Sequence, residues 1–125
     1  MTPPAHSLKI RIRLYCGDEI AMGPGKADLL DAIAREGSIS AAGRALGMSY
    51  RRTWLLVDAM NRCWAEPLVA TSPGKATAGA RVTPLGEDVL RRYRAMQQAV
   101  ADSGAAEWRG LEALLLPQPK ASQKV

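Results

Sequence analysis

Two adjacent arginines, Arg51 and Arg52, stand at the start of an amphipathic stretch that is expected to be a helix. The N-terminal end of a helix carries a partial positive charge, so a purely structural helix favours Asp or Glu there. Cations at this position indicate that a partner supplies negative charge, as duplex DNA does. A guanidinium group bonds to phosphates and can pair with a guanine edge. The arginine pair therefore predicts a DNA contact, with an ordinary solvated helix end as the alternative.

A short helix and a tight turn precede these arginines. Ser38 or Ser40 can cap the first helix, and Gly47 can end it. Ser49 can then cap a second helix that is expected to run to about Trp64. This layout is typical of a helix-turn-helix, whose second helix enters the major groove with its first residues. The predicted DNA contacts of this hairpin are Ser38, Ser40, Ser49, Tyr50, Arg51, Arg52 and Thr53.

A small basic hairpin is expected directly after the second helix. Residues 68–71 and 81–85 have the pattern of short strands, and the tip between them, residues 72–79, contains no acidic residue. A basic hairpin at this place can act as a wing that contacts backbone phosphates or a minor groove, with a surface hairpin of incidental charge as the alternative. The predicted contacts of the wing are Lys75, Thr77 and Arg81.

Positive charge is concentrated in this part of the chain. The 125 residues carry 17 Lys and Arg against 12 Asp and Glu, a formal net charge of +5. Residues 38–86 hold six basic and two acidic residues, a net of +4. The remaining residues hold eleven basic and ten acidic ones, a net of +1. The excess lies where a polyanion is expected to bind.

The N-terminal segment is expected to be a strand. Residues 8–15 alternate between apolar and mostly basic side chains, which indicates a half-buried strand that pairs with residues 19–22 across a turn. Its basic face is expected to be solvated, with DNA contact as the alternative. Residues 1–7 and 117–125 are expected to be disordered tails around one domain, residues 8–116.

Three further helices are expected, at residues 26–36, 84–102 and 105–116, the second with Thr83 as its cap. Ala34 is expected to face inward in the first of these helices, and Arg94 outward in the second. The fold class is therefore mainly α with a small β component: a winged helix-turn-helix with an N-terminal strand pair, a β-hairpin wing and C-terminal dimerisation helices. The C-terminal helices carry apolar faces that must pack on the N-terminal strand or on a second copy of the chain.

No residue pattern indicates an enzyme. His6 is the only histidine and is expected to be solvated. The acidic pairs Asp28–Asp31 and Glu87–Asp88 are typical of the first turns of helices. We therefore predict no catalytic residue, no metal ligands and no cofactor.

The cysteines and the hydropathy pattern bear on the compartment. Cys16 and Cys63 belong to no paired motif and fall in apolar patterns, so buried thiols are expected. There is no signal peptide and no apolar run of membrane-spanning length. A cytoplasmic protein is expected.

Several separated motifs resemble the winged helix-turn-helix shared by LysR-type regulators and the molybdate-responsive ModE family. Ser49 and Tyr50 followed by Trp54, and then Met60 and Asn61, are similar to the ModE-like pattern. The motifs that carry the resemblance are Gly-Ser-Ile-Ser-Ala-Ala at 37–42, Ala-Leu-Gly-Met-Ser at 45–49, Leu-Val at 68–69 and Val-Thr-Pro-Leu-Gly at 82–86.

This resemblance implies a transcriptional regulator that binds pseudo-palindromic promoter DNA as a homodimer, in molybdenum-related or oxyanion-related gene control. It also implies that Trp54 and Met60 are packing positions of the recognition helix. Full-length family members continue into β-barrel domains that bind molybdate or tungstate. The sequence has neither these domains nor their Ser-Ala-Arg-Asn-type motif, so no small-molecule effector is evident, while molybdate and tungstate stay open. The alternative function is a protein-interaction module built on a winged-helix scaffold.

Overall fold

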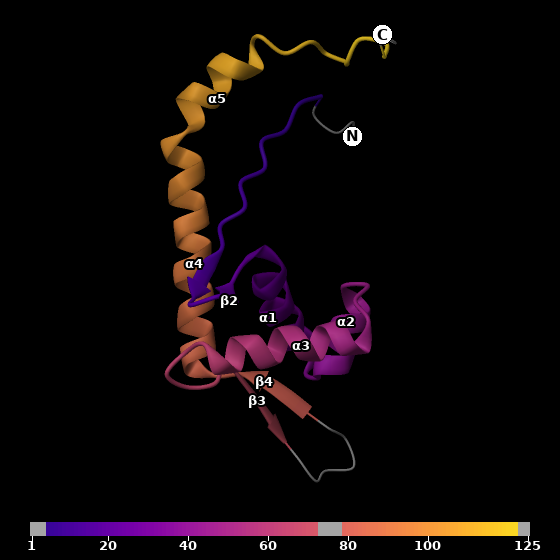
Figure 1. Cartoon of the computed structure of the whole chain (residues 1–125), viewed down its shortest axis with the longest axis vertical. Helices are drawn as coiled ribbons and strands as arrows, with labels where there is room; N and C mark the ends of the chain where they lie inside the picture. Colours follow the sequence, from indigo (N-terminus) through magenta and orange to yellow (C-terminus); the bar gives the residue numbers. More distant parts are fainter. Residues whose placement is uncertain (1–4, 73–78, 123–125) are drawn as a thin grey trace.

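The structure of the protein is a computed structural model that describes residues 5–72 and 79–122. It is a winged helix-turn-helix, as predicted, with two separate antiparallel strand pairs (Figure 1). In chain order the elements are β1 (Leu14–Cys16), β2 (Glu19–Met22), α1 (Pro24–Glu36), α2 (Ile39–Ala45), α3 (Tyr50–Arg62), β3 (Val69–Ser72), β4 (Gly79–Val82), α4 (Pro84–Ser103) and α5 (Ala105–Glu112).

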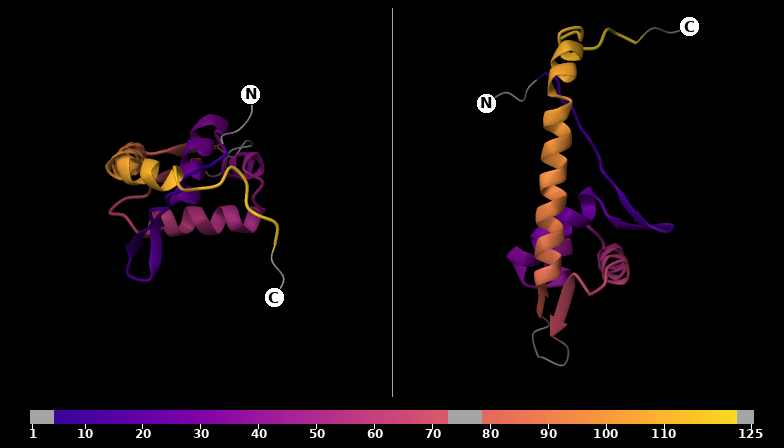
Figure 2. Two further views of the ribbon diagram at one scale, coloured as in Figure 1. Left: turned by 90° about the horizontal axis from the view of Figure 1, so that it is seen from above. Right: turned by 90° about the vertical axis from the view of Figure 1, so that its left-hand side faces the viewer.

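The molecule divides into a head, residues 14–93, and an arm, residues 98–116. The head contains the hydrophobic core, in which Leu30, Ile33 and Met60 are fully buried. The arm consists of the end of α4, of α5 and of the residues that follow up to 116, and it rises away from the head as a helical rod with a bend near its end (Figure 2). None of the arm residues is buried. The core therefore belongs to the head alone.

Serine and threonine caps fix the helix starts that the sequence predicted. The Ser38 hydroxyl accepts from the amide of Ala41 at 3.0 Å, and the Ser49 hydroxyl accepts from the amide of Arg52 at 3.1 Å. Thr83 caps α4 in the same way. These bonds satisfy amide groups that have no partner inside the helix.

The turn between α2 and α3 depends on two glycines. Gly47 has a φ of 70°, in the left-handed region that glycine adopts without strain. Gly43 lies at the crossing of the two helices, where an added Cβ atom would lie 2.2 Å from the Oγ1 atom of Thr53. The absence of a side chain at Gly43 thus allows α3 to approach α2 closely.

The predicted N-terminal strand is the main error in the fold. β1 covers only Leu14–Cys16, and Leu8 and Ile10 are exposed. Its partner β2 has four residues, so the preceding residues find no strand to pair with. The alternation of apolar residues indicates an amphipathic segment, but it does not show that a second strand is present to pair with it. Cys16, expected to be buried, is exposed at the end of β1, and Cys63 is half-buried.

Smaller differences concern the helices. α3 ends at Arg62 instead of about residue 64, and α5 ends at Glu112 instead of 116. Ala34 of α1 is exposed, because the helix buries Leu29 and Ala32 instead. His6, expected to be solvated, hydrogen-bonds through Nε2 to the carbonyl oxygen of Leu116 at 2.7 Å.

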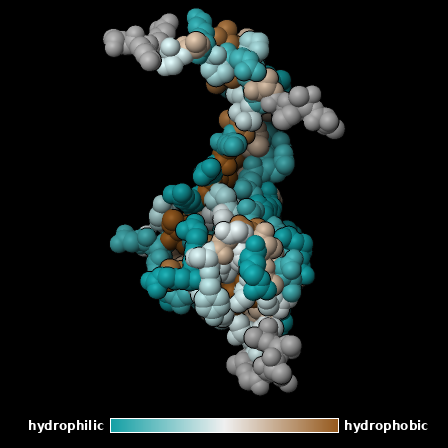
Figure 3. All heavy atoms as spheres, turned by 90° about the vertical axis from the view of Figure 1, so that its right-hand side faces the viewer, coloured by the Kyte–Doolittle hydropathy of each residue, from teal (hydrophilic) through white to brown (hydrophobic). Residues whose placement is uncertain are grey.

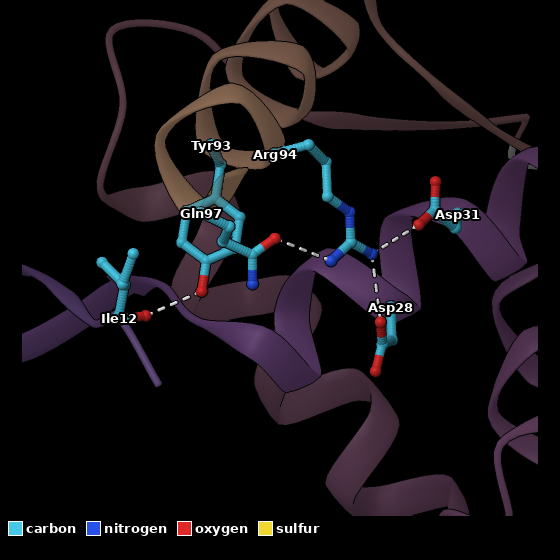
Figure 4. A network of polar contacts seen from close by, with 6 residues as sticks. All are labelled: Ile12, Asp28, Asp31, Tyr93, Arg94 and Gln97. Atoms are coloured by element: carbon cyan, nitrogen blue, oxygen red, sulfur yellow. Dashed lines mark hydrogen bonds and ion pairs between the residues drawn. The ribbon is translucent and has the colours of Figure 1, made fainter. Parts of the chain in front are cut away.

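A polar junction fixes α4 to the head (Figure 4). The Tyr93 hydroxyl donates to the carbonyl of Ile12 at 2.7 Å, and burial raises the pKa of this tyrosine. Arg94, expected to face outward, donates to Asp28 at 3.0 Å and to Asp31 at 2.6 Å. Both carboxylates lie on α1, so the junction connects the N-terminal segment, α1 and α4.

Candidate nucleic-acid interface

The first turn of α3 presents its polar and aromatic side chains to solvent. Ser49 caps the helix, and Tyr50, Arg51 and Arg52 are exposed. Tyr50 has 68% of its surface exposed and lies beside Trp54, with 6.1 Å between the ring centroids. The predicted contacts at this helix start are therefore accessible, apart from Thr53.

Thr53 is not accessible, and its prediction as a DNA contact is wrong. Its side chain is 1% exposed, and its hydroxyl donates to the Ser49 carbonyl at 2.8 Å. It packs against Gly43 at the crossing of α2 and α3. Thr53 shares the buried face of α3 with Val57 and Met60, four and seven residues on, and that spacing was a usable signal in the sequence.

Trp54 departs from its expected packing position. The residue is 38% exposed, and Leu55 beside it is 55% exposed. Neither residue is among the DNA contacts predicted from the sequence. A helical spacing places Leu55 opposite the buried face that Thr53, Val57 and Met60 define and Trp54 at the edge of that face, which could have revealed them. They contribute apolar surface of the kind that packs on a thymine methyl group.

A groove of about 400 Å³ separates the helix-turn-helix from the wing. Its lining residues are Ser38, Ile39, Ser40, Trp54, Thr71, Ser72, Gly79 and Ala80. Ser38 and Ser40 thus lie at this groove, although the Ser38 hydroxyl is already used as a cap. The amide of Ala80 donates to the carbonyl of Gly37 at 2.8 Å and holds the wing against the end of α1.

Only part of the predicted wing can be placed. β3 and β4 pair in register from Val69 with Val82 to Ser72 with Gly79. Arg81 is exposed on β4. Lys75 and Thr77 lie outside the described residues, so their predicted contacts stay predictions.

Ion pairing separates the arginines of α3 into two groups. Arg62 contacts Glu19 at 2.6 Å and Asp58 at 2.8 Å, and hydrogen bonds to these carboxylates raise its pKa. Arg51, Arg52 and Arg81 form no ion pair with any residue in 5–72 or 79–122. Within α3 and the described part of the wing, the uncompensated cations therefore lie at the helix start and on β4, while the end of α3 is neutralised.

Other kinds of site find little support in the residues that the structure describes. Within that part of the chain no cluster of three or more His, Cys, Asp or Glu side chains could hold a metal ion. No described helix combines the length and the apolar character needed to cross a membrane.

The helices, wing and exposed basic helix start define a winged helix-turn-helix domain. Residues 26–87 match the family of bacterial regulatory helix-turn-helix proteins of the lysR type. The full-length LysR-type regulator LysG of Corynebacterium glutamicum, solved with bound effector Arg, superposes with a TM-score of 0.52 at 29% identity. The match covers 75% of this chain and 30% of LysG. Residues 26–87 thus form a helix-turn-helix domain of the lysR type.

Curated relatives place the chain more narrowly. The molybdenum-pterin-binding protein MopB of Rhodobacter capsulatus is 48% identical over 81 residues, which are 64% of this chain and 30% of MopB. The DNA-binding transcriptional dual regulator ModE of Escherichia coli is 30% identical over 91 residues, which are 72% of this chain and 35% of ModE. The chain is thus ModE-like, as the motifs indicated, and it spans about a third of the length of these relatives.

Proposed function

We propose that this protein is a DNA-binding transcriptional regulator related to molybdenum. The observation that carries the proposal is the set of unpaired, exposed arginines at the start of α3, on a domain of the lysR family. The names of the curated relatives support the link to molybdenum and to DNA. α3 is the recognition helix of this proposal, and the hairpin β3–β4 is its wing.

In this proposal the recognition helix and the wing make different kinds of contact with DNA. Arg51 and Tyr50 lie at the exposed helix start. The contact of an arginine with a guanine edge is the most common specific contact in the major groove. Trp54 and Leu55 add apolar surface beside them. Arg81, with Lys75 and Thr77 from the sequence, contacts the phosphate backbone and positions the domain without reading bases.

The regulator acts as a homodimer, with the arm as the dimerisation surface. Leu111, Leu114 and Leu115 are exposed by 61%, 82% and 49%. Apolar surface also lies along the stalk above the head (Figure 3), and Leu8 and Ile10 of the N-terminal segment and Val100 of α4 are each more than a third exposed. A soluble helix with this much apolar surface is typical of an interface, and a two-fold dimer matches the pseudo-palindromic sites of such regulators.

Binding to DNA tests the proposal. The protein is titrated against a duplex of its own upstream region and against random duplex, across a salt series, with and without molybdate. We expect selective binding whose affinity falls steeply with salt. Arg51→Ala lowers the specific affinity by at least ~1 kcal/mol. Arg91→Ala on the head part of α4, an exposed arginine that pairs with Asp88, is the matched control and leaves the affinity unchanged. Equal binding to both duplexes at every salt concentration contradicts the proposal and favours a protein-interaction module.

A further inference from the structure

A second, basic pocket lies on the side of α3 that is turned toward β1 and β2. Its volume is about 400 Å³, and four parts of the chain form it: the N-terminal segment, β2, the start of α1 and the first half of α3. The lining residues are Arg11, Arg13, Ile20, Gly23, Pro24, Gly25, Lys26, Arg52 and Leu56. Four of them are cations and none is a carboxylate, so the pocket is complementary to an anion.

The start of α1 opens into this pocket with unsatisfied amides. Its N-cap, Gly23, has no side chain to accept from them, and no acidic residue lies in the first turn. Pro24 has no amide hydrogen, so Gly25 and Lys26 present the first free N–H groups of a helix of 13 residues. The Arg13 side chain passes over this cap, since a Cβ atom at Gly23 would lie 3.7 Å from its Cγ atom. Amides and guanidinium therefore face the same space.

The surroundings of Lys26 indicate that the pocket lacks an anionic partner. It is 8% exposed, yet within residues 5–72 and 79–122 its ammonium group has no hydrogen bond and no ion pair. Burial lowers its pKa, and Arg52 and Arg13 lower it further against the opposite effect of Cys63 and Glu19. Glu19 is already held by Arg62 at 2.6 Å. No side-chain nitrogen of the described residues is fully buried without a partner, so the Lys26 ammonium reaches solvent, and it lines the pocket together with the arginines but without a carboxylate.

We propose that this pocket binds a tetrahedral oxyanion, held by the Lys26 ammonium, the guanidinium groups of Arg13 and Arg52, and the free amides at the start of α1. Helix N-termini and arginine forks are the groups that recognise phosphate-like oxygens. Two sources have this chemistry: a free dianion such as phosphate, sulfate or molybdate, and a phosphodiester of bound DNA. The second source alone rests on the proposed function.

Thermal unfolding with free anions tests the first source. The melting temperature is measured in chloride and in phosphate, sulfate or molybdate at equal ionic strength. We expect each binding oxyanion to raise the melting temperature of the wild-type protein by several degrees. Lys26→Met removes this rise and also makes the protein more stable in chloride, because it removes a partly desolvated cation that has no ion pair among the described residues. Lys9→Met, the same change at an exposed residue outside the pocket, keeps the rise.

Binding to DNA tests the second source. The slope of log affinity against log salt is compared among the wild-type protein, Lys26→Met, Arg13→Gln and Lys9→Met. A phosphodiester in the pocket reduces the slope by about one for each pocket variant and leaves Lys9→Met unchanged. An effect in either experiment supports the site, and the experiment in which it occurs identifies the source of the anion. If Lys26→Met and Lys9→Met behave alike in both experiments, the proposal is wrong. A wild-type protein without DNA selectivity contradicts the proposed function, and the unfolding experiment with free anions then decides the proposal alone.

Discussion

The head and the arm of this molecule are built from similar helices but are stabilised differently. Within the head, α4 buries Gly86, Val89 and Tyr93. Beyond Tyr93 the same helix buries no described residue, and neither does α5. The change occurs within one continuous helix, so helix propensity cannot explain it. The head has its own core, whereas the arm exposes leucines that need a partner.

The largest expected effect is a loss of stability in the head. Gly86 lies in the first turn of α4, where an added Cβ atom would lie 2.4 Å from the carbonyl oxygen of Leu68 and 2.7 Å from a Val82 methyl group. The obstructing oxygen belongs to the backbone, so α4 must move away from the start of the wing. We expect Gly86→Ala to lower the free energy of unfolding by at least ~2 kcal/mol in urea denaturation. An unchanged transition midpoint contradicts this packing.

The next largest effect is a weaker association of the arm with the second copy of the chain. Burying one leucine is worth about 1.5–3 kcal/mol, so Leu111→Lys is expected to weaken the proposed dimer at least tenfold. Sedimentation equilibrium over a range of concentrations measures this change. The head keeps its circular dichroism spectrum, since Leu111 contributes nothing to the core. Ser103→Lys adds the same charge at an exposed polar position of α4 and serves as the control. A variant that associates as strongly as the wild type places the interface elsewhere.

A smaller effect concerns the junction between the two regions. Tyr93→Phe removes the hydrogen bond to the carbonyl of Ile12 and leaves that acceptor without its donor. We expect a loss of about 1 kcal/mol in the free energy of unfolding. Tyr15→Phe, at a residue that is 60% exposed, is the matched control and should change stability little. If the two variants lose the same amount, the junction does not hold the N-terminal segment to α4.

The comparison also shows which features a sequence can reveal. Ser49 and Thr83 were identified as caps, and Ser38 as one of two candidates, because capping involves residues only three positions apart. Residues 8–13 were misread as strand because a strand depends on a distant partner. Thr53 looked like a surface residue from its polarity, but its burial follows from the close approach of α2 at Gly43.

The basic pocket could not be predicted from the sequence for the same reason. It joins Arg11 and Arg13 to Lys26 and to Arg52, which are far apart along the chain. The sequence showed a basic face on the N-terminal segment and a basic start of α3, each by itself. Only the packing of β1 and β2 beside α3 brings them to one place (Figure 1). Long-range geometry therefore decides this candidate site, whereas the exposed start of α3 follows from local signals.

The smallest expected effect comes from the same glycine-to-alanine change as in the head, made this time in the arm. Gly110 lies in α5, and an added Cβ atom there meets no atom within 4 Å. Gly110→Ala is expected to raise stability by up to ~1 kcal/mol, since alanine favours a helix over glycine. Chemical denaturation at low protein concentration, where monomers dominate, measures this gain. The same variant at high concentration reports on the interface: a lost gain means that a partner helix approaches Gly110 closely, and an equal gain means that the partner contacts the leucine face of α5 alone.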